Sequence, residues 1–243
     1  MFKKAYWVIF GSILGIVSSA FADCPNADKM AREKGLSEAL PVYQSCAIGQ
    51  NDDDSQLYLA RIFATGQGSI SKSRTKALLF YHLSAENGNA TAMVELSKLL
   101  TEMDNDEIGR NEILTYLGKL QTQLRIMPAN SFSGELLHPY ALLMLAAESP
   151  ESKWFYTTKQ TSDPRAAQFL KNYKIDPDKK KEVIRAATQW KQRKMIDLAR
   201  EVFSVSEFKE FYQTLYPKTG LPNSFARSQA VDKLKAKVES RKK

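Results

Sequence analysis

The chain has 243 residues, a formal net charge of +8 and 43% hydrophobic residues. A chain of this length can bury a hydrophobic core, and one elongated domain or two short subdomains are typical of it. It contains only two histidines and two cysteines. Neither histidine has a cysteine or suitably spaced carboxylates near it in the sequence, so the pattern indicates no metal site and no cofactor.

The first 22 residues have the order of a secretory signal peptide. Lys3 and Lys4 precede an apolar run over residues 5–17, and a small-residue A-x-A sequence ends at Ala22. We therefore expect cleavage after Ala22 and a periplasmic protein, or a secreted one. A retained anchor helix is the alternative, which the short apolar run and the adjoining cleavage site disfavour.

The two cysteines, Cys24 and Cys46, are expected to form one disulfide bond. Export to an oxidising compartment favours their pairing, and the bond would enclose the first predicted helical hairpin. Two buried free thiols are the alternative. A nucleophilic role is disfavoured, because no histidine lies beside either cysteine in the sequence.

An apolar and aromatic pattern recurs along the next hundred residues. Residues 39–43 match residues 77–81 at an offset of 38, and Tyr81 matches Tyr116 at an offset of 35. The segment around Leu59 matches the segment around Leu96 at an offset of 37. Such periods are typical of helical solenoids. We predict an all-α fold, a solenoid of antiparallel helix pairs with additional C-terminal helices; chance alignment of ordinary hairpins is the alternative.

The central unit of this pattern, over residues 59–88, also carries a particular set of residues in a fixed order. A Leu-Ala pair and an aromatic residue precede a G-x-G sequence, and Lys-Ala plus an aromatic pair follow it. This order resembles the Sel-one-like repeat, a relative of the tetratricopeptide repeat, and the resemblance implies an exported bacterial member. It also implies structural roles for Leu59, Ala60, Phe63, Gly66, Gly68, Ala77, Phe80 and Gly88.

The match has departures, and its glycines have a simple physical role. Ser73 stands where the family usually has an acidic residue, Ser84 replaces a common alanine, and the third unit lacks the glycine loop. Gly66 and Gly68 can adopt positive φ, which lets a helix stop and the chain turn back. Because no strand pattern precedes them, they do not indicate a phosphate site.

Four further helices are predicted after residue 130. His138-Pro139 marks the start of one, and Asp176-Pro177 caps another that runs through Trp190. Aromatic-rich amphipathic helices follow over residues 195–203 and 206–215. The predicted division is a signal peptide (1–22), Sel-one-like repeats (23–130), a C-terminal helical region continuing the solenoid (131–228) and a basic helical or disordered tail (229–243).

Candidate catalytic groups are sparse. Asp52, Asp53 and Asp54 are expected to start a helix, since the oxygen spacing and glycine of a calcium loop are absent. His82 and His138 lie inside helical patterns, and a surface or inter-repeat packing role is expected for His82. Carboxylates in the loop over residues 102–107 leave a general acid open, although nothing there indicates a raised pKa. We predict no catalytic residue.

The sequence therefore predicts a non-enzymatic scaffold of the cell envelope that binds other envelope proteins, with a secretion system or flagellar motor as its setting. We expect Tyr58, Arg61, Tyr81 and His82 to be exposed on its binding surface. The basic tail is either solvated or docks on an anionic protein or membrane surface; nucleic acid is disfavoured by export. The alternatives are an exported enzyme acting on envelope polymers and a secreted host-interaction factor.

Overall fold

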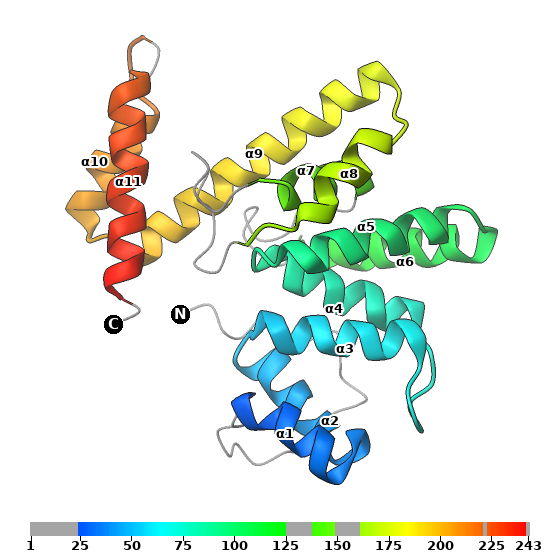
Figure 1. Ribbon diagram of the computed structural model, residues 1–243. Helices are drawn as coiled ribbons and strands as arrows, with labels where there is room; N and C mark the ends of the chain where they lie inside the picture. Colours follow the sequence, from blue (N-terminus) through cyan, green and yellow to red (C-terminus); the bar gives the residue numbers. More distant parts are fainter. Residues whose placement is uncertain (1–23, 125–137, 149–160, 221–222, 242–243) are drawn as a thin grey trace. The chain divides into compact units, whose positions relative to one another are not determined.

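The structure is a computed structural model that describes residues 24–124, 138–148, 161–220 and 223–241. These residues form eleven α-helices and one π-helical turn, with a single isolated bridge between Gln67 and Ile70 (Figure 1). The predicted all-α class is confirmed. The predicted signal peptide lies outside the described residues, and none of the helices described is long and apolar enough to cross a bilayer.

The chain divides into two compact units, and each is described by itself. The first comprises residues 1–86 and 98–134, and the second comprises residues 87–97 and 135–243. The helices of the N-terminal half are α1 (Cys24–Lys34), α2 (Leu36–Gln44), the π-helical turn (Ser45–Gly49), α3 (Asp53–Thr65), α4 (Arg74–Glu86), α5 (Ala90–Asp104) and α6 (Glu107–Leu124). The boundary between the units falls within α5.

Local capping signals set the bounds of α3 and α4. The Asp52 carboxylate accepts a hydrogen bond from the Ser55 amide at 2.9 Å, which confirms the predicted helix start. Gly66 ends α3 with φ +73°, and a Cβ there would lie only 3.1 Å from the Lys72 amide nitrogen. Gly88 follows α4 with φ +90°. The predicted glycine turns are therefore present, and Gly66 is required both by conformation and by space.

Helices α3 and α4 pack closely in the first unit. The rings of Phe63 and Phe80 stack with centroids 5.8 Å apart, and the Lys76 ammonium lies 5.0 Å from the Phe63 centroid. The buried Ser84 hydroxyl donates to the Asp53 carbonyl oxygen at 2.8 Å. Ser84 thus links the two helices. The buried apolar residues at the predicted repeat positions are Leu59, Ala60, Phe63, Ala77 and Phe80.

The second unit contains the later helices α7 (Pro139–Ala146), α8 (Pro164–Asn172), α9 (Pro177–Val202), α10 (Val205–Leu215) and α11 (Ser224–Ser240). His138 caps α7, and Asp176 accepts hydrogen bonds from two amides at the start of α9 at 2.9 and 3.1 Å. Both predicted helix starts are confirmed. The predicted segments ending at Trp190 and beginning at Met195 form one unbroken helix, because no glycine or proline separates them.

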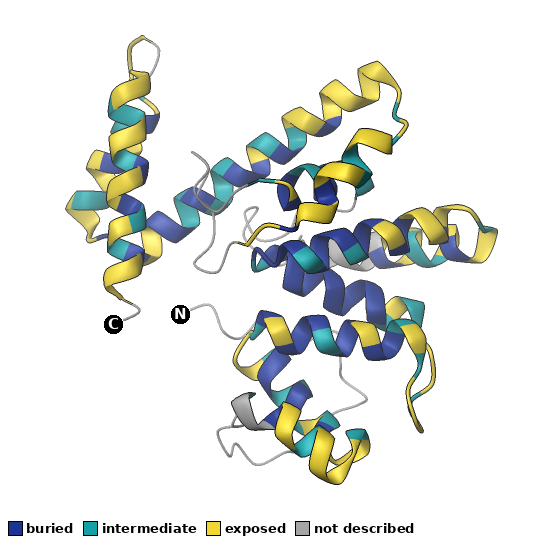
Figure 2. Ribbon diagram, in the orientation of Figure 1, coloured by how far each residue is buried: buried dark blue, intermediate teal, exposed yellow. Residues whose placement is uncertain are grey.

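The C-terminal tail is a packed helix along its described length. Helix α11 begins at Ser224, five residues before the predicted tail, and its Val231, Leu234 and Val238 are buried. They join a core from the end of α9 and from α10 that includes Met195, Leu198, Phe203, Phe211 and Leu215. The burial stripe along α11 is visible in Figure 2. Residues 229–240 are therefore helical, as one of the alternatives predicted, and they are not fully solvated, because the apolar face of the helix is packed while its other residues are exposed or partly exposed.

Candidate functional site

The four predicted binding residues fall into two environments. Arg61 is exposed on α3 and Tyr58 is half-buried there, whereas Tyr81 and His82 are buried on α4. Every residue of α4 from 77 to 86 is buried, so this part of the helix has no exposed face. The expectation that Tyr81 and His82 are exposed is therefore wrong, and the predicted surface reduces to the two α3 residues.

Tyr58 belongs to an aromatic contact between α2 and α3. Its ring stacks on Tyr43 with centroids 4.2 Å apart and an interplanar angle of 27°. The buried Tyr43 hydroxyl donates a short hydrogen bond to the carboxylate of Asp28 on α1. Burial and this bond raise the pKa of Tyr43 well above its usual range. The half-exposed Tyr58 ring is thus held by residues of two neighbouring helices, beside the exposed Arg61 one turn along α3.

A disulfide bond fixes the first helix of this region. Cys24 and Cys46 are bonded, with Cα atoms 5.7 Å apart, which confirms the predicted pairing. Cys24 begins α1, and Cys46 lies in the π-helical turn that follows α2. The bond therefore closes a loop containing α1 and α2, and so it restrains the helix that carries Asp28.

A buried polar array connects α4 with α6 in the first unit. The His82 Nδ1 atom lies 2.9 Å from the Tyr116 hydroxyl oxygen, and its Nε2 atom lies 3.7 Å from a carboxylate oxygen of Glu86. All three residues are at most 5% exposed. The order carboxylate, imidazole, hydroxyl would suit proton transfer, but burial closes it to a substrate in this conformation. Sequence reasoning missed the array because Tyr116 is 34 residues from His82.

The acidic loop after α5 has a structural role at Asp106. One carboxylate oxygen accepts from the Gly109 amide at 2.6 Å, and the other accepts from the Arg74 guanidinium at 2.8 Å. These contacts lower the pKa of Asp106, with the Gly109 amide as the largest cause. Arg74 also lies 3.1 Å from Glu112. Since a general acid at neutral pH needs a raised pKa, Asp106 is suited to capping α6 and not to acid catalysis.

His138 is engaged at the start of α7. Its Nδ1 atom accepts a hydrogen bond from the Tyr140 amide at 3.2 Å, and its ring meets that of Tyr173 edge-on. Burial, assisted by the charge of Lys179, lowers the pKa of His138. The neutral imidazole is the form that can accept this bond. Across the described ranges, no three His, Cys, Asp or Glu side chains gather closely enough to hold a metal ion.

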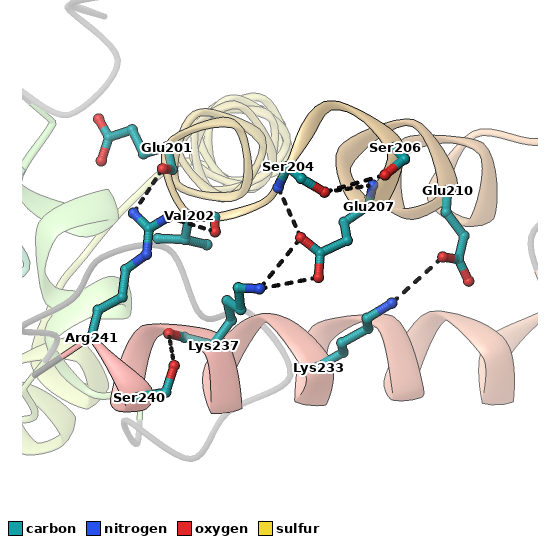
Figure 3. Close-up of polar contacts among 10 residues, drawn as sticks. All are labelled: Glu201, Val202, Ser204, Ser206, Glu207, Glu210, Lys233, Lys237, Ser240 and Arg241. Atoms are coloured by element: carbon teal, nitrogen blue, oxygen red, sulfur yellow. Dashed lines mark hydrogen bonds and ion pairs between the residues drawn. The ribbon is translucent and has the colours of Figure 1, made fainter. Parts of the chain in front are cut away.

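Three of the basic side chains that the sequence offered for docking on an anionic surface, Lys233, Lys237 and Arg241, have internal partners (Figure 3). Lys237 lies 3.1 Å from Glu207, and Lys233 lies 3.5 Å from Glu210. Arg241 donates to the carbonyl oxygens of Glu201 and Val202, both at 2.9 Å, at the end of α9. Helix α11 is therefore joined to α9 and α10 by its own cations.

Glu207 is the most strongly perturbed carboxyl group in this C-terminal cluster. It accepts a hydrogen bond from the Ser204 backbone amide at 2.8 Å while the Ser204 hydroxyl accepts from the Glu207 amide, which together form a capping box. The Ser204 amide, and after it Lys237, lower the pKa of Glu207 to about 2. Glu207 thus caps α10 and pairs with α11 at the same time.

No family model, curated protein or solved structure matched the chain. The resemblance to the Sel-one-like repeat therefore rests on the residues of the central unit alone.

Proposed function

We propose that the protein is an exported, non-enzymatic scaffold of the cell envelope, built from Sel-one-like helix pairs that stack as a solenoid. The observation that carries the proposal is the surface of α3 formed by the half-buried Tyr58 and the exposed Arg61. Tyrosine and arginine are enriched among residues that dominate protein interfaces. Stacking on Tyr43 limits the conformational freedom of Tyr58, so less entropy would be lost when a partner binds.

The register of the helix pairs supports a repeating architecture. Tyr43, Tyr81 and Tyr116, which share one position of the predicted repeat, lie on α2, α4 and α6 and are all buried. Helices α1 and α2 contact each other, as do α3 and α4. Equivalent aromatic residues at equivalent depths are typical of repeat proteins, in which each unit buries its apolar face on its neighbours.

The disulfide bond supports export to the periplasm. Disulfides persist in oxidising compartments and are rare where thiols are kept reduced. In this chain the bond joins the first described residue to the end of the first helix pair. A periplasmic location after removal of residues 1–22 would account for it. The enzyme alternative gains nothing from Asp106, whose pKa is lowered.

In-cell photocrosslinking tests the proposal. A photoreactive phenylalanine analogue is placed at Tyr58 or at Arg61, and the exposed Lys181 of α9 is the matched control. We expect discrete higher-mass adducts from the two α3 positions and none from the control. Adducts of monomer mass alone from every position would contradict the scaffold function. Mass spectrometry of the isolated protein checks the predicted new N-terminus at Asp23.

A further inference from the structure

The outer face of α10 carries an uncovered row of apolar and aromatic side chains. Val205 is 89% exposed, Tyr212 is 45% exposed and Tyr216 is 37% exposed, and Phe208 is partly buried at the edge of the core. The ring centroids of Phe208 and Tyr212 are 6.1 Å apart, and those of Tyr212 and Tyr216 are 5.1 Å apart. We call these four residues the α10 ridge. They occupy one stripe along a helix about 16 Å long.

The charges of α10 are distributed to its two sides. Its two carboxylates, Glu207 and Glu210, contact Lys237 and Lys233 of α11. Lys209 is exposed and is four residues from Val205 and three from Tyr212, which places it on the same helix face as the ridge. The ridge side of α10 is therefore aromatic and cationic, while its two carboxylates pair with lysines of α11.

A second cation lies against the ridge from α9. The Arg200 guanidinium is 5.3 Å from the Phe208 ring centroid, and it also pairs with Asp197 at 3.1 Å. The arginine is exposed, so it can reach an anion beyond the protein while its side chain still lies on the ring.

We propose that the α10 ridge binds the surface of an anionic lipid bilayer. Tyrosine suits the boundary between headgroups and acyl chains because its ring is apolar and its hydroxyl is polar. Lys209 and Arg200 would lie near lipid phosphates, and each cation would strengthen the attraction to such a surface. A fluid bilayer can accept an exposed helix face without the matching groove that a protein partner would need. The contact is weak and reversible, as expected for a short interfacial helix.

This proposal is independent of the scaffold function. It places membrane contact on α10, where Lys209 and Arg200 lie beside the aromatic row, whereas the sequence had offered the lysines of α11 for this role. Crosslinking from α3 can therefore fail while the ridge binds lipid, and the reverse can also occur.

Vesicle sedimentation with the exported chain in its oxidised form tests the ridge. The chain is mixed with vesicles of phosphatidylethanolamine and phosphatidylglycerol, or with vesicles of phosphatidylcholine alone. We expect sedimentation with the anionic vesicles only, decreasing as salt rises. The double variant Tyr212→Ser/Tyr216→Ser should bind about tenfold more weakly, and Lys209→Glu should also bind more weakly. Unfolding curves should coincide with that of the unmodified chain, because the replaced groups are exposed.

Phe225→Ser is the matched control, since Phe225 is 69% exposed on α11 and is not part of the ridge. It should bind as the unmodified chain does. The proposal is overturned if the unmodified chain ignores anionic vesicles, or if the double variant binds them normally. Binding to soluble polyglutamate but not to vesicles would also overturn it and would identify an acidic polypeptide as the ligand of the ridge. Binding lost only in a chain that ends at Arg241 would assign the contact to residues 242–243.

Discussion

The α3–α4 pair of the first unit and the α10–α11 pair of the second are held together by different kinds of contact. Aromatic stacking and a buried hydroxyl-to-carbonyl bond join α3 to α4. Helices α10 and α11 share an apolar core, and lysine–glutamate pairs at its edge add to it. The first arrangement depends on a few residues of fixed size and polarity. We expect the second to tolerate more substitutions, so point changes should affect the first unit more strongly.

The largest effect is expected from removing the disulfide. Cys24→Ser/Cys46→Ser should lower the free energy of unfolding by about 3 kcal/mol, because the bond restricts the unfolded chain over a sequence separation of 22 residues. Denaturant unfolding with and without a reductant measures this. The reductant should destabilise the unmodified chain and leave the double variant unchanged. Equal stability of the unmodified chain and the double variant in the absence of reductant would contradict the structural importance of the bond.

A methyl group at Gly109 should have the next largest effect. A Cβ there would lie 2.2 Å from the Met103 carbonyl oxygen, so Gly109→Ala must displace the backbone where α5 ends and α6 begins. We expect a loss of about 1–3 kcal/mol in unfolding free energy. Gly118→Ala in the same helix is the control, because a Cβ at Gly118 meets nothing within 4 Å. It should stabilise the protein by up to about 1 kcal/mol, and a loss equal to that of Gly109→Ala would refute the steric explanation.

Removing one buried hydroxyl distinguishes the two regions more finely. Tyr116→Phe removes the group 2.9 Å from His82 and should destabilise the first unit by about 1–2 kcal/mol, since a buried polar atom loses its partner. The same change at the exposed Tyr212 of α10 should alter stability by less than about 0.5 kcal/mol. Thermal and denaturant unfolding of both variants provide the comparison. Similar losses of unfolding free energy at the two positions would contradict the explanation that burial of the hydroxyl determines its contribution to stability.

The smallest effect concerns the titration of Glu207. Its pKa of about 2 lies below the ordinary value of 4.5, so the charged carboxylate stabilises the fold above pH 4.5 and this contribution is lost as the pH falls towards 2. Lys237→Gln should raise the pKa only part of the way to 4.5, because the Ser204 amide remains as a donor. NMR titration of the side chain measures the shift. Lys233→Gln, whose lysine contacts Glu210, should leave Glu207 unchanged.

Local signals in the sequence predicted the helix starts and turns well. Asp52, His138 and Asp176 each cap the helix that directly follows them, and Gly66 turns the chain at the end of α3. Each signal acts within a few residues, so it can be recognised without knowledge of the fold. The Cys24–Cys46 bond was also predictable, because the chain has no other cysteine.

Contacts between distant residues could not be predicted in the same way. The aromatic pattern correctly placed Tyr81 and His82 on a helix, but it could not show that α4 is buried over residues 77–86. The basic composition of α11 suggested a solvated tail, whereas Val231 and Leu234 pack on helices far earlier in the sequence. Residues 206–215 were likewise recognised as an amphipathic helix, but the sequence did not show which of its apolar side chains are exposed. Burial depends on which helices pack together, and single-helix periodicity does not determine that.

The bond between Arg241 and the end of α9 also bears on when this part of the protein can fold. The carbonyl oxygens of Glu201 and Val202 receive their donor from a residue about forty positions later. A growing chain can form α9 early, but the carbonyl oxygens of Glu201 and Val202 lack their Arg241 donor until residue 241 has left the ribosome and, if the protein is exported, has crossed the membrane. Completion of this cluster therefore requires residue 241 to have been synthesised. Chains interrupted earlier would expose the apolar stripe of α9 to proteases, which would favour their removal.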